Sequence, residues 1–486
     1  MTPIDLGAVR PFNFPDDAPV TSFERTAIRI LASDDADLIL HLNAHMYLTA
    51  KEKSVPISAD HVNSRWPTSW ATLRRPYPPY TFDVIYVADL WAEQPEVVIR
   101  QGLEILESIT SLGASVGVVN LPPTLIEGSL PLVQAKDSGN LKFLDLQANL
   151  GDYRLAAMTV EARRRAFLAQ AQIENYLEDN WTLGDKTLTP GTRVALHQEL
   201  WQRLRRNVTC DLIVVRDPLM PIGAIATWVE SREGSRVISF QHGVVPCLHK
   251  YIPILGTAHL TFGPHSANLL SAMNLTYAGH IRQRHAVTHP IGNYVHKTPE
   301  STRGSLEQRL LVLDQSSEWA DGYYGLEQGN LDIAQLAAHW LQMMPNNQVT
   351  VRPHPSASGL ENWLTLKGQF GTRVSISHPR VPLLEDVDTA TVAMSLFSGA
   401  ALAAAANRVP TLLLGRQGRP WTMDLQSFSE LTLSVEEAAD QLVRLQRDPT
   451  VRDELAADSF AAATGYFGHA SYRPITGKTI AHYLGS

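Results

Sequence analysis

The chain has 486 residues and a formal net charge of −8 at pH 7, with 44% hydrophobic and 19% charged residues. This composition is typical of a soluble globular enzyme, and the length exceeds what one ordinary core holds, so we expect two domains. The acidic balance argues against general nucleic-acid binding, and no long uncharged apolar run indicates a membrane span.

The beginning of the chain and its cysteines indicate a cytoplasmic protein. The first residues, Met1-Thr2-Pro3-Ile4-Asp5, lack the basic start and apolar core of a secretory signal. Cys210 and Cys247 cannot form a disulfide framework, and their flanks lack zinc-ligand spacing. Arginine clusters at 163–165 and 203–206 are interpreted as solvated helix faces. The alternative is that these arginines form a patch that contacts a membrane surface or an acidic acceptor. Peripheral association with the inner face of the cytoplasmic membrane therefore stays open.

Short apolar runs alternate with helical stretches, which is the pattern of parallel α/β architecture. In the N-terminal half, Val97 to Ser111 has helical spacing of its apolar residues, and Val160 to Leu177 is rich in good helix formers. The strands predicted in this half are Ala27 to Ala32, Asp83 to Ala88, Ser115 to Asn120, Asp211 to Val215, Arg236 to Phe240 and His259 to Phe262.

A second series of elements begins with the strand-like run 309–313, after the polar segment Lys297 to Gln308. That segment is the predicted boundary between an acceptor or catalytic domain, residues 1–300, and a nucleotide-sugar-binding domain, residues 301–486. In the second series we predict a helix at 331–341 and strands at 348–351, 391–394 and 411–414. Ser434 and Glu437 form a capping-box pattern that predicts the start of a further helix.

The strand at 348–351 is followed by Arg352-Pro353-His354-Pro355-Ser356. Because these residues follow a strand, Arg352 and His354 should lie at its carboxyl end, where open α/β sheets bind ligands. The structural alternative for His354 is a strand-end histidine that is hydrogen-bonded to a neighbouring loop.

A second motif, Ser395-Leu396-Phe397-Ser398-Gly399-Ala400, connects the strand at 391–394 to the helix-forming tract at 400–407. Its hydroxyls and Gly399 should therefore lie at a helix N-terminus, which offers backbone N–H groups and a positive dipole to a phosphate. Helix capping by Ser395 and Ser398 is an alternative use that is compatible with phosphate binding. Breaking a sugar–phosphate bond leaves negative charge on phosphate, and the residues of the two motifs are the types that neutralise it.

The order of these motifs resembles that of a known group of enzymes. The ordered set is Gln241-His242-Gly243, Phe262-Gly263-Pro264, His289-Pro290-Ile291-Gly292-Asn293, Arg352-Pro353-His354-Pro355 and Ser395 to Gly399. Over residues 211–415 the chain resembles the group that holds bacterial polysialyltransferases, capsule and O-antigen Kdo transferases and, more distantly, CDP-glycerol glycerophosphotransferases. Dipeptides such as His-Pro also occur elsewhere in the chain, so the ordered set carries the resemblance.

The resemblance implies an α/β fold of the GT-B type, with two Rossmann-like domains facing each other across a ligand cleft. In the CMP-sugar branches of the group, a His-Pro motif and a serine motif bind the CMP moiety, which implies donor-binding roles for His354, Pro355, Ser395 and Ser398. Arg352, Gly243 and Gly399 complete the predicted nucleotide and donor site. The two glycines are included because glycine allows close approach of the backbone to a ligand.

Activation of the acceptor requires a carboxylate or histidine from the first domain, and Asp217 and His242 are the catalytic candidates. Asp217 follows the strand at 211–215 and precedes Pro218, where the chain must leave the sheet, so it should lie at the edge of the cleft. In Kdo transferases of the group that retain configuration, an aspartate of the first domain is thought to be the nucleophile, and Asp217 is the position to test. The structural alternative for Asp217 is an aspartate in a turn or at a helix cap. The structural alternative for His242 is a buried histidine that is hydrogen-bonded to a backbone carbonyl. Glu161 and Glu174 are weaker candidates.

We expect no catalytic metal and no cofactor. Residues 34–37 and Asp386-Val387-Asp388 contain Asp-x-Asp, which metal-dependent transferases of another fold use, but both are interpreted as structural. The histidines also lack a metal-site spacing, because the Pro290 next to His289 argues against a helix that would align it with His285.

The sequence therefore predicts a metal-independent glycosyltransferase that moves Kdo or a sialic-type nonulosonic acid from a CMP-activated donor to a surface glycan or glycolipid acceptor. The sugar class is implied by the resemblance. Three alternatives stay open: a polyol-phosphate transferase of the CDP-glycerol kind, a UDP-sugar epimerase, and a degenerate member that binds glycan without turnover. The acceptor, the linkage, the retained or inverted configuration and the oligomeric state are not indicated.

Overall fold

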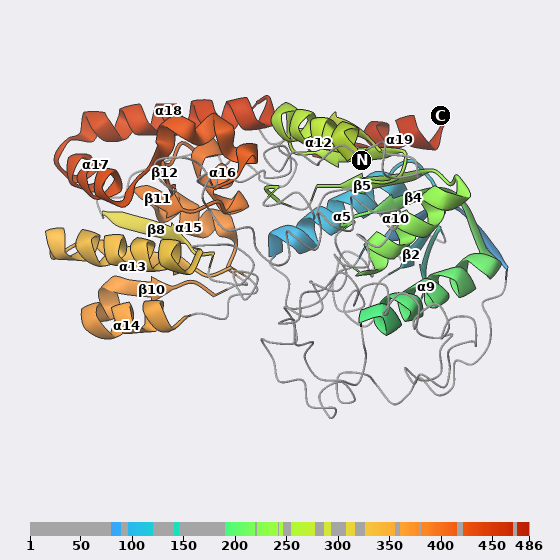
Figure 1. Cartoon of the computed structure of the whole chain (residues 1–486), viewed down its shortest axis with the longest axis horizontal. Coiled ribbons are helices and arrows are strands. Elements are labelled where there is room, and N and C mark those ends of the chain that lie inside the picture. Colours follow the sequence, from blue (N-terminus) through green and yellow to red (C-terminus); the bar gives the residue numbers. More distant parts are fainter. Residues whose placement is uncertain are drawn as a thin grey trace, which may run out of the picture.

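The computed structural model contains two parallel β-sheets with helices packed around them (Figure 1). The residues it describes are 79–88, 96–119, 140–144, 190–218, 221–241, 243–245, 254–277, 286–292, 308–315, 326–354, 360–378, 381–415, 421–469 and 474–485.

The first sheet belongs to the N-terminal half. Its strands are β1 (Tyr80–Val87), β2 (Val116–Val119), β3 (Leu141–Leu144), β4 (Val208–Val215), β5 (Val237–Phe240), β6 (Ala258–Thr261) and β7 (Val287–Pro290). They pair in the order β3-β2-β1-β4-β5-β6-β7, and every pair is parallel. The order therefore reverses between β1 and β4, which makes the carboxyl ends of these two strands the topological switch point of the sheet.

The second sheet repeats this arrangement. Its strands are β8 (Arg309–Leu313), β9 (Gln348–Arg352), β10 (Val374–Ile376), β11 (Val392–Ser395), β12 (Thr411–Leu414) and β13 (Thr432–Leu433). Their order is β10-β9-β8-β11-β12-β13, again parallel throughout. The switch point is therefore between β8 and β11, and both sheets have the Rossmann pattern of strand order.

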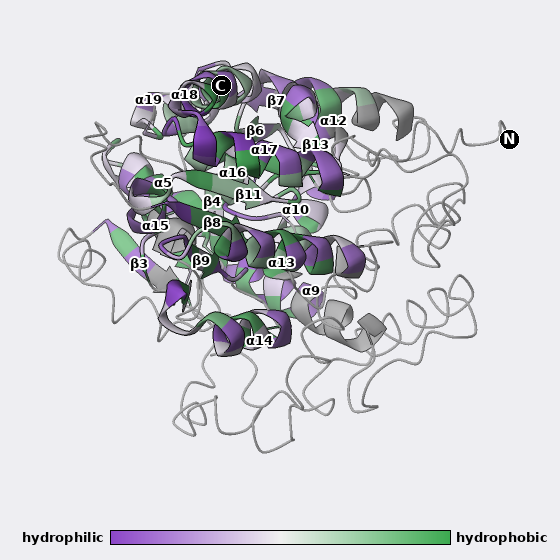
Figure 2. Ribbon diagram, turned by 90° about the vertical axis from the view of Figure 1, so that its left-hand side faces the viewer, coloured by the Kyte–Doolittle hydropathy of each residue, from purple (hydrophilic) through white to green (hydrophobic). Residues whose placement is uncertain are grey.

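Helices cover the sheets because the apolar faces of the sheets must be buried away from water. In the first domain these are α5 (Glu96–Thr110), α9 (Pro190–Asn207), α10 (Pro221–Glu233) and α12 (Pro264–Tyr277). In the second half they are α13 (Leu326–Met343), α14 (Glu361–Phe370), α15 (Leu383–Thr389), α16 (Gly399–Ala406), α17 (Val435–Arg447), α18 (Pro449–Phe467) and α19 (Gly477–Leu484), with 3₁₀ segments η5 (Gly371–Arg373) and η6 (Met423–Leu431). Figure 2 shows hydrophobic residues along the inner strands and hydrophilic residues on α13 and α17. Trp340 of α13 and Trp363 of α14 are buried in the core.

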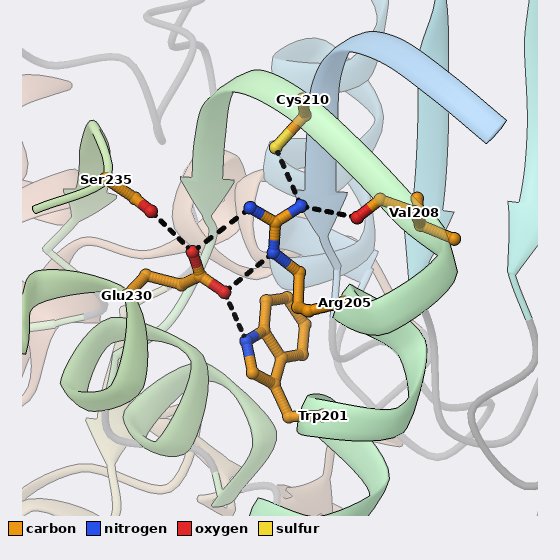
Figure 3. A network of polar contacts seen from close by, with 6 residues as sticks. All are labelled: Trp201, Arg205, Val208, Cys210, Glu230 and Ser235. Atoms are coloured by element: carbon orange, nitrogen blue, oxygen red, sulfur yellow. Dashed lines mark hydrogen bonds and ion pairs between the residues drawn. The ribbon is translucent and has the colours of Figure 1, made fainter. Parts of the chain in front are cut away.

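A buried ionic network holds part of the first domain together (Figure 3). Glu230 of α10 is 0% exposed, and its carboxylate accepts hydrogen bonds from Arg205 Nε at 2.8 Å and Trp201 Nε1 at 2.7 Å, both on α9. The Ser235 hydroxyl donates to its other oxygen. Arg205 also donates to the carbonyl of Val208, where β4 begins. The network therefore fixes α9 and α10 against β4.

Most predicted elements of the described ranges are present. The strand predicted at 83–88 is β1, and those predicted at 115–120, 211–215, 236–240 and 259–262 are β2, β4, β5 and β6, with ends shifted by at most three residues. The second series is found as β8, α13, β9, β11 and β12, and Ser434 with Glu437 forms the predicted capping box of α17. The predicted strand at 27–32 and helix at 160–177 lie outside the described residues.

The C-terminal elements return to the first domain. Helix α18 extends from the second domain towards α12, and α19 lies against α5 (Figure 1). The Ser108 hydroxyl of α5 donates to the carbonyl of Ile475, and Arg236 donates to the carbonyl of Leu484 at 3.1 Å. Residues 474–485 thus pack with the first sheet, whereas the segment predicted as the domain boundary lies mostly outside the described residues.

Close packing at the junction of α12 and α18 requires a glycine. A β-carbon placed on Gly263 would lie 1.9 Å from the carbonyl oxygen of Tyr466, so any larger residue would force the two helices apart. The rings of Phe262 and Phe467 lie 6.5 Å apart beside this contact. Within the described ranges, no helix combines the length and apolarity needed to cross a bilayer.

Candidate functional site

The serine motif lies at the switch point of the second sheet. Ser395 is the last residue of β11 and is 0% exposed, and its hydroxyl donates to the carbonyl of Leu313 at the end of β8. Its oxygen also accepts from the backbone N–H of Ser398 at 3.2 Å. Ser395 therefore joins the two strands at the switch point and shapes the turn into α16, which is the position expected for a ligand site.

Ser398 is the N-cap of α16, because its hydroxyl oxygen accepts from the backbone N–H of Ala400 at 3.2 Å. Gly399 is the first helical residue, and the helix that follows is almost entirely alanine and is buried. Other N–H groups in the first turn of a helix have no partner within it, and they are directed out of the N-terminus together with the positive end of the dipole. The predicted capping role of Ser398 is confirmed, and it leaves the helix end able to bind an anion.

The Arg-Pro-His-Pro segment lies at the end of β9. Arg352 NH1 contacts Asp386 Oδ2 of α15 at 2.6 Å, and both side chains are 11% exposed. Ser377 also donates to this oxygen at 2.7 Å. The guanidinium is therefore neutralised in this conformation, and Asp386 is bonded to Arg352 and Ser377. His354 is half-buried, and Pro355 lies outside the described residues.

Asp217 lies at the switch point of the first sheet. It follows Arg216, whose backbone N–H donates to the carbonyl of Val87 and whose Nε donates to that of Ala88, both at the end of β1. Asp217 is 1% exposed. The first turn of α10 packs directly on it, since a β-carbon on Gly223 would lie 2.1 Å from the Asp217 carbonyl oxygen. Asp217 thus lies at the carboxyl edge of the first sheet, but its side chain is buried, so its predicted place at the edge of a cleft stays a prediction.

A buried histidine lies near Asp217. His259 on β6 is 0% exposed, and its Nδ1 lies 2.8 Å from the hydroxyl of Ser239 on the neighbouring strand β5. Burial lowers the pKa of His259 to about 3, although the nearby Asp217 carboxylate acts in the opposite direction. His259 is therefore neutral at physiological pH, and its ring shares a hydrogen bond with Ser239.

The loop after β5 reaches the second domain. Gln241 is 0% exposed, and its side chain accepts from the backbone N–H of Phe262 at 2.8 Å and donates to the carbonyl of Gly243 at 2.7 Å. A β-carbon placed on Gly399 would lie 4.0 Å from Cγ2 of Val244. The Gln-His-Gly loop and the start of α16 are therefore neighbours, although His242 itself lies outside the described residues.

A buried polar network connects this loop to η6 and α18. Asp424 of η6 is 0% exposed and accepts from the backbone N–H of Val245 at 2.8 Å, from the Ser266 hydroxyl at 2.7 Å and from the Tyr466 hydroxyl at 2.8 Å. Gln241 Nε2 lies 3.3 Å from both hydroxyl oxygens. Burial raises the pKa of Asp424, and it raises that of Tyr466 well above the usual value for tyrosine. Sequence reasoning did not identify Ser266, Asp424 or Tyr466.

The structure thus brings part of the predicted site together. Gly243, Ser395, Ser398 and Gly399 lie where the carboxyl edges of the two sheets approach each other, and Arg352 lies on β9, the strand beside β8 at the same edge of the second sheet. Asp217 lies at the corresponding edge of the first sheet but is buried. Among the described residues, no group of three or more His, Cys, Asp and Glu side chains is placed to hold a metal ion.

Comparison with known proteins identifies the fold. No family model matches the sequence, and no curated protein matches it. The UDP-GlcNAc 2-epimerase from Neisseria meningitidis bound to UDP-GlcNAc superimposes with a TM-score of 0.50 at 12% identity, covering 83% of this chain and 99% of that one. The shared fold is the GT-B arrangement. The prediction of an α/β protein with two Rossmann-like domains is confirmed.

Two other solved structures are similar over comparable lengths. Sucrose-phosphate synthase from Thermosynechococcus elongatus has a TM-score of 0.48 at 13% identity, covering 83% of this chain and 97% of that one. A glycosyltransferase from Rickettsia africae has a TM-score of 0.46 at 9% identity, covering 84% and 99%.

Proposed function

We propose that the protein is a GT-B glycosyltransferase that moves an acidic sugar, Kdo or a sialic-type nonulosonic acid, from a CMP-sugar to a surface glycan or glycolipid. The observation that carries this proposal is the approach of Val244, next to the Gln-His-Gly motif, to Gly399 at the start of α16. Val244 and Gly399 are 155 residues apart in the sequence (399 − 244), yet they meet at the carboxyl edges of the two sheets. Open α/β sheets bind ligands at such edges.

In this proposal the N-terminus of α16 binds the phosphate of the donor. Its backbone N–H groups and dipole stabilise the negative charge that develops as the sugar–phosphate bond breaks. Ser398 shapes this end, and Gly399 lets the phosphate approach the backbone. His354 and Pro355 bind the nucleotide, and Arg352 supplies positive potential that is reduced by its ion pair with Asp386.

His242 is the first catalytic candidate to test, and Asp217 is the second. An acid, base or nucleophile must come within hydrogen-bond reach of the reacting atom. Because Asp217 is 1% exposed under the first turn of α10, contact with an acceptor or donor requires a change of conformation around it. His242→Ala should therefore lower kcat without abolishing nucleotide binding. We retain the prediction that no metal is needed, so a chelator should leave transfer unchanged.

The decisive experiment is a thermal-shift and calorimetric comparison of CMP, CDP, UDP and GDP on the full chain. A ligand at one hundred times its Kd stabilises the folded state by about 2.7 kcal/mol. We expect CMP to bind most tightly and His354→Ala to lose most of this affinity. His378→Ala is the matched control, because His378 is also followed by proline but is exposed after β10. CMP binding to His354→Ala at wild-type affinity would contradict the site.

A UDP-sugar epimerase is the second candidate. It is favoured by one observation, the fold shared with a 2-epimerase that is bound to UDP-GlcNAc. In the same experiment, tight binding of UDP and weak binding of CMP would support this alternative. Preference for CDP would support polyol-phosphate transfer, and absence of binding by all four nucleotides would support a non-catalytic glycan-binding role.

A further inference from the structure

The segment Gly243–Val245 is held at both ends by side chains, one from the residue pair that precedes it and two from far along the chain. At one end, the carbonyl of Gly243 accepts from Gln241 Nε2 at 2.7 Å. At the other end, the backbone N–H of Val245 donates to Asp424 Oδ2 at 2.8 Å, and the carbonyl of Val245 accepts from the Thr422 hydroxyl at 2.6 Å. Three backbone groups of a short loop are thus bonded to buried side chains, which fixes the conformation of the loop.

Two of these side chains belong to the second domain. Asp424 and Thr422 lie at the start of η6, and the Thr422 oxygen accepts from the backbone N–H of Asp424, so the pair is a preorganised unit. Both side chains are 0% exposed. Burying a carboxylate and a hydroxyl is unfavourable unless they are hydrogen-bonded. Here the compensating partners include the backbone of a loop in the other domain.

The remaining partners of Asp424 reinforce this connection. Ser266 on α12 and Tyr466 on α18 donate to its two oxygens, and their hydroxyl oxygens lie 3.0 Å apart. Gln241 closes the network from the first domain, with its amide nitrogen 3.3 Å from each of these hydroxyls. The loop, α12, η6 and α18 are therefore joined by one set of buried hydrogen bonds.

We propose that Thr422 and Asp424 are positioning residues, which hold Gly243–Val245 against the first turn of α16 and so complete the nucleotide site from the second domain. This inference rests on the proposed function, because it names how that site is assembled. Its geometric basis is that Val244, between the two anchored residues, lies beside Gly399. A loop freed at Val245 no longer keeps a fixed contact with the start of α16, although the Ser398 cap of that helix is untouched.

The test compares two substitutions at Thr422 in the full chain. Thr422→Val has a similar shape but no hydroxyl, so it cannot donate to the carbonyl of Val245. Thr422→Ser retains the hydroxyl. By calorimetry, we expect Thr422→Val to raise the Kd for CMP at least tenfold and Thr422→Ser to stay within about threefold of wild type. Since both variants disturb the same buried position, rescue by serine separates positioning from general damage to the fold.

Asp448→Ala is the control for lost stability alone. Asp448 caps the N-terminus of α18, the helix that carries Tyr466, but it is exposed and takes no part in the network. It should lower the melting temperature while leaving the Kd for CMP unchanged. If folded Thr422→Val binds CMP with wild-type affinity, or if Asp448→Ala weakens CMP binding as much as Thr422→Val does, the positioning role is wrong.

Hydrogen exchange of the backbone amides, measured without nucleotide, keeps this inference separate from the proposed function. The Val245 amide should be protected in wild type and in Thr422→Ser, and should exchange at least tenfold faster in Thr422→Val. If wild type binds none of the four nucleotides, the proposed function and the positioning role both fail, whereas protection at Val245 would still show that η6 anchors the loop. CMP binding without protection at Val245 would reject the anchoring alone.

Discussion

Two buried carboxylates, Glu230 and Asp424, differ in how their burial is compensated. Both side chains are 0% exposed. Glu230 is bonded to the guanidinium of Arg205 and to neighbours within the first domain, on α9 and just after α10. Asp424 is bonded to neutral donors, a backbone amide and two hydroxyls, which come from both domains. The first arrangement holds one domain together, whereas the second forms only when two domains are docked.

The difference has an electrostatic consequence. A guanidinium stabilises a buried carboxylate in its charged form, whereas neutral donors offset the loss of hydration less completely. Burial accordingly raises the pKa of Asp424 despite three hydrogen bonds to it. Substitutions in the Glu230 network should therefore change the stability of the first domain, and those in the Asp424 network should change both stability and the nucleotide site.

The largest effect is expected for Glu230→Ala. It leaves the guanidinium of Arg205, which is 17% exposed, without its carboxylate. Removing one partner of a buried ion pair costs about 3–5 kcal/mol. Urea unfolding followed by circular dichroism measures this loss. The double variant Arg205→Met/Glu230→Leu should recover part of it, because neither charge remains. A loss below about 1 kcal/mol in the single variant would show that solvent reaches Arg205 and that the network is not essential.

The next largest expected effect is on how stability depends on pH, and its sign differs between His259 and Asp424. The folded pKa of His259 is about 3, below its ordinary value of 6.5, so the unfolded state binds the proton first as pH falls. Its contribution to stability is present above pH 6.5 and decreases towards pH 3, by about 2 kcal/mol between pH 7 and pH 5. His259→Asn should flatten this part of the stability curve. The pH dependence that Asp424 contributes has the opposite sign. Because its pKa is raised in the folded state, its contribution to stability decreases as pH increases.

The measurement is the free energy of unfolding from urea titrations at several pH values. Wild type and His259→Asn should differ in slope by close to one proton between pH 6 and pH 4, within the interval that separates the two pKa values. Equal slopes would indicate that His259 binds a proton in the folded state, and would argue against its burial beside Ser239.

A pair of tyrosines offers the sharpest comparison of local and interdomain bonding. Tyr466→Phe removes a donor to Asp424, and Tyr86→Phe removes a donor to the carbonyl of Gly102 within the first domain. Loss of one buried hydrogen bond costs about 0.5–1.5 kcal/mol, so both variants should be less stable. Only Tyr466→Phe should also weaken CMP binding. Equal nucleotide affinities in the two variants would remove the link between the Asp424 network and the site.

The smallest effect is expected for Ser434→Ala, which serves as the baseline. Ser434 caps α17, forms no hydrogen bond with the members of either network, and accepts from the backbone N–H of Glu437. Loss of such a cap costs about 1 kcal/mol of unfolding free energy. CMP affinity, measured by calorimetry, should not change. If a substitution in the Asp424 network lowers stability without changing CMP affinity, as expected for Ser434→Ala, the substituted residue has only a structural role.

The fold was largely predictable because buried parallel strands are short runs of apolar residues. Leu310 to Leu313 and Val392 to Met394 are almost completely buried, and their sequences consist of the residues that such strands require. β7 was missed because its residues, Val287–Pro290, are mostly polar or partly exposed and end in proline. The position of Ser398 at a helix N-terminus could also be predicted, because the cap and the strand that precedes it are local in sequence.

The interdomain network could not be predicted from the sequence. Ser266 and Asp424 are separated by 158 residues, and Val245 and Asp424 by 179, so no periodicity or motif connects them. Arg352 illustrates a related limit, since its position at the end of β9 was predicted but its ion pair with Asp386 was not. Strand order and loop contacts determine such pairs, and these depend on the complete fold. The roles of the predicted site residues stay predictions.

The return of α19 to the first sheet affects the order in which the protein can fold during synthesis. Domains generally fold as units as the chain emerges from the ribosome. Here α5 is covered by α19, and Ile480 and Tyr483 are buried in this contact. The first domain therefore keeps part of its apolar surface exposed until residues 474–485 have been made, by which time the whole second sheet is available. The first domain is thus completed late, and a nascent chain that stalls within the second domain presents an unfinished first domain to chaperones and proteases.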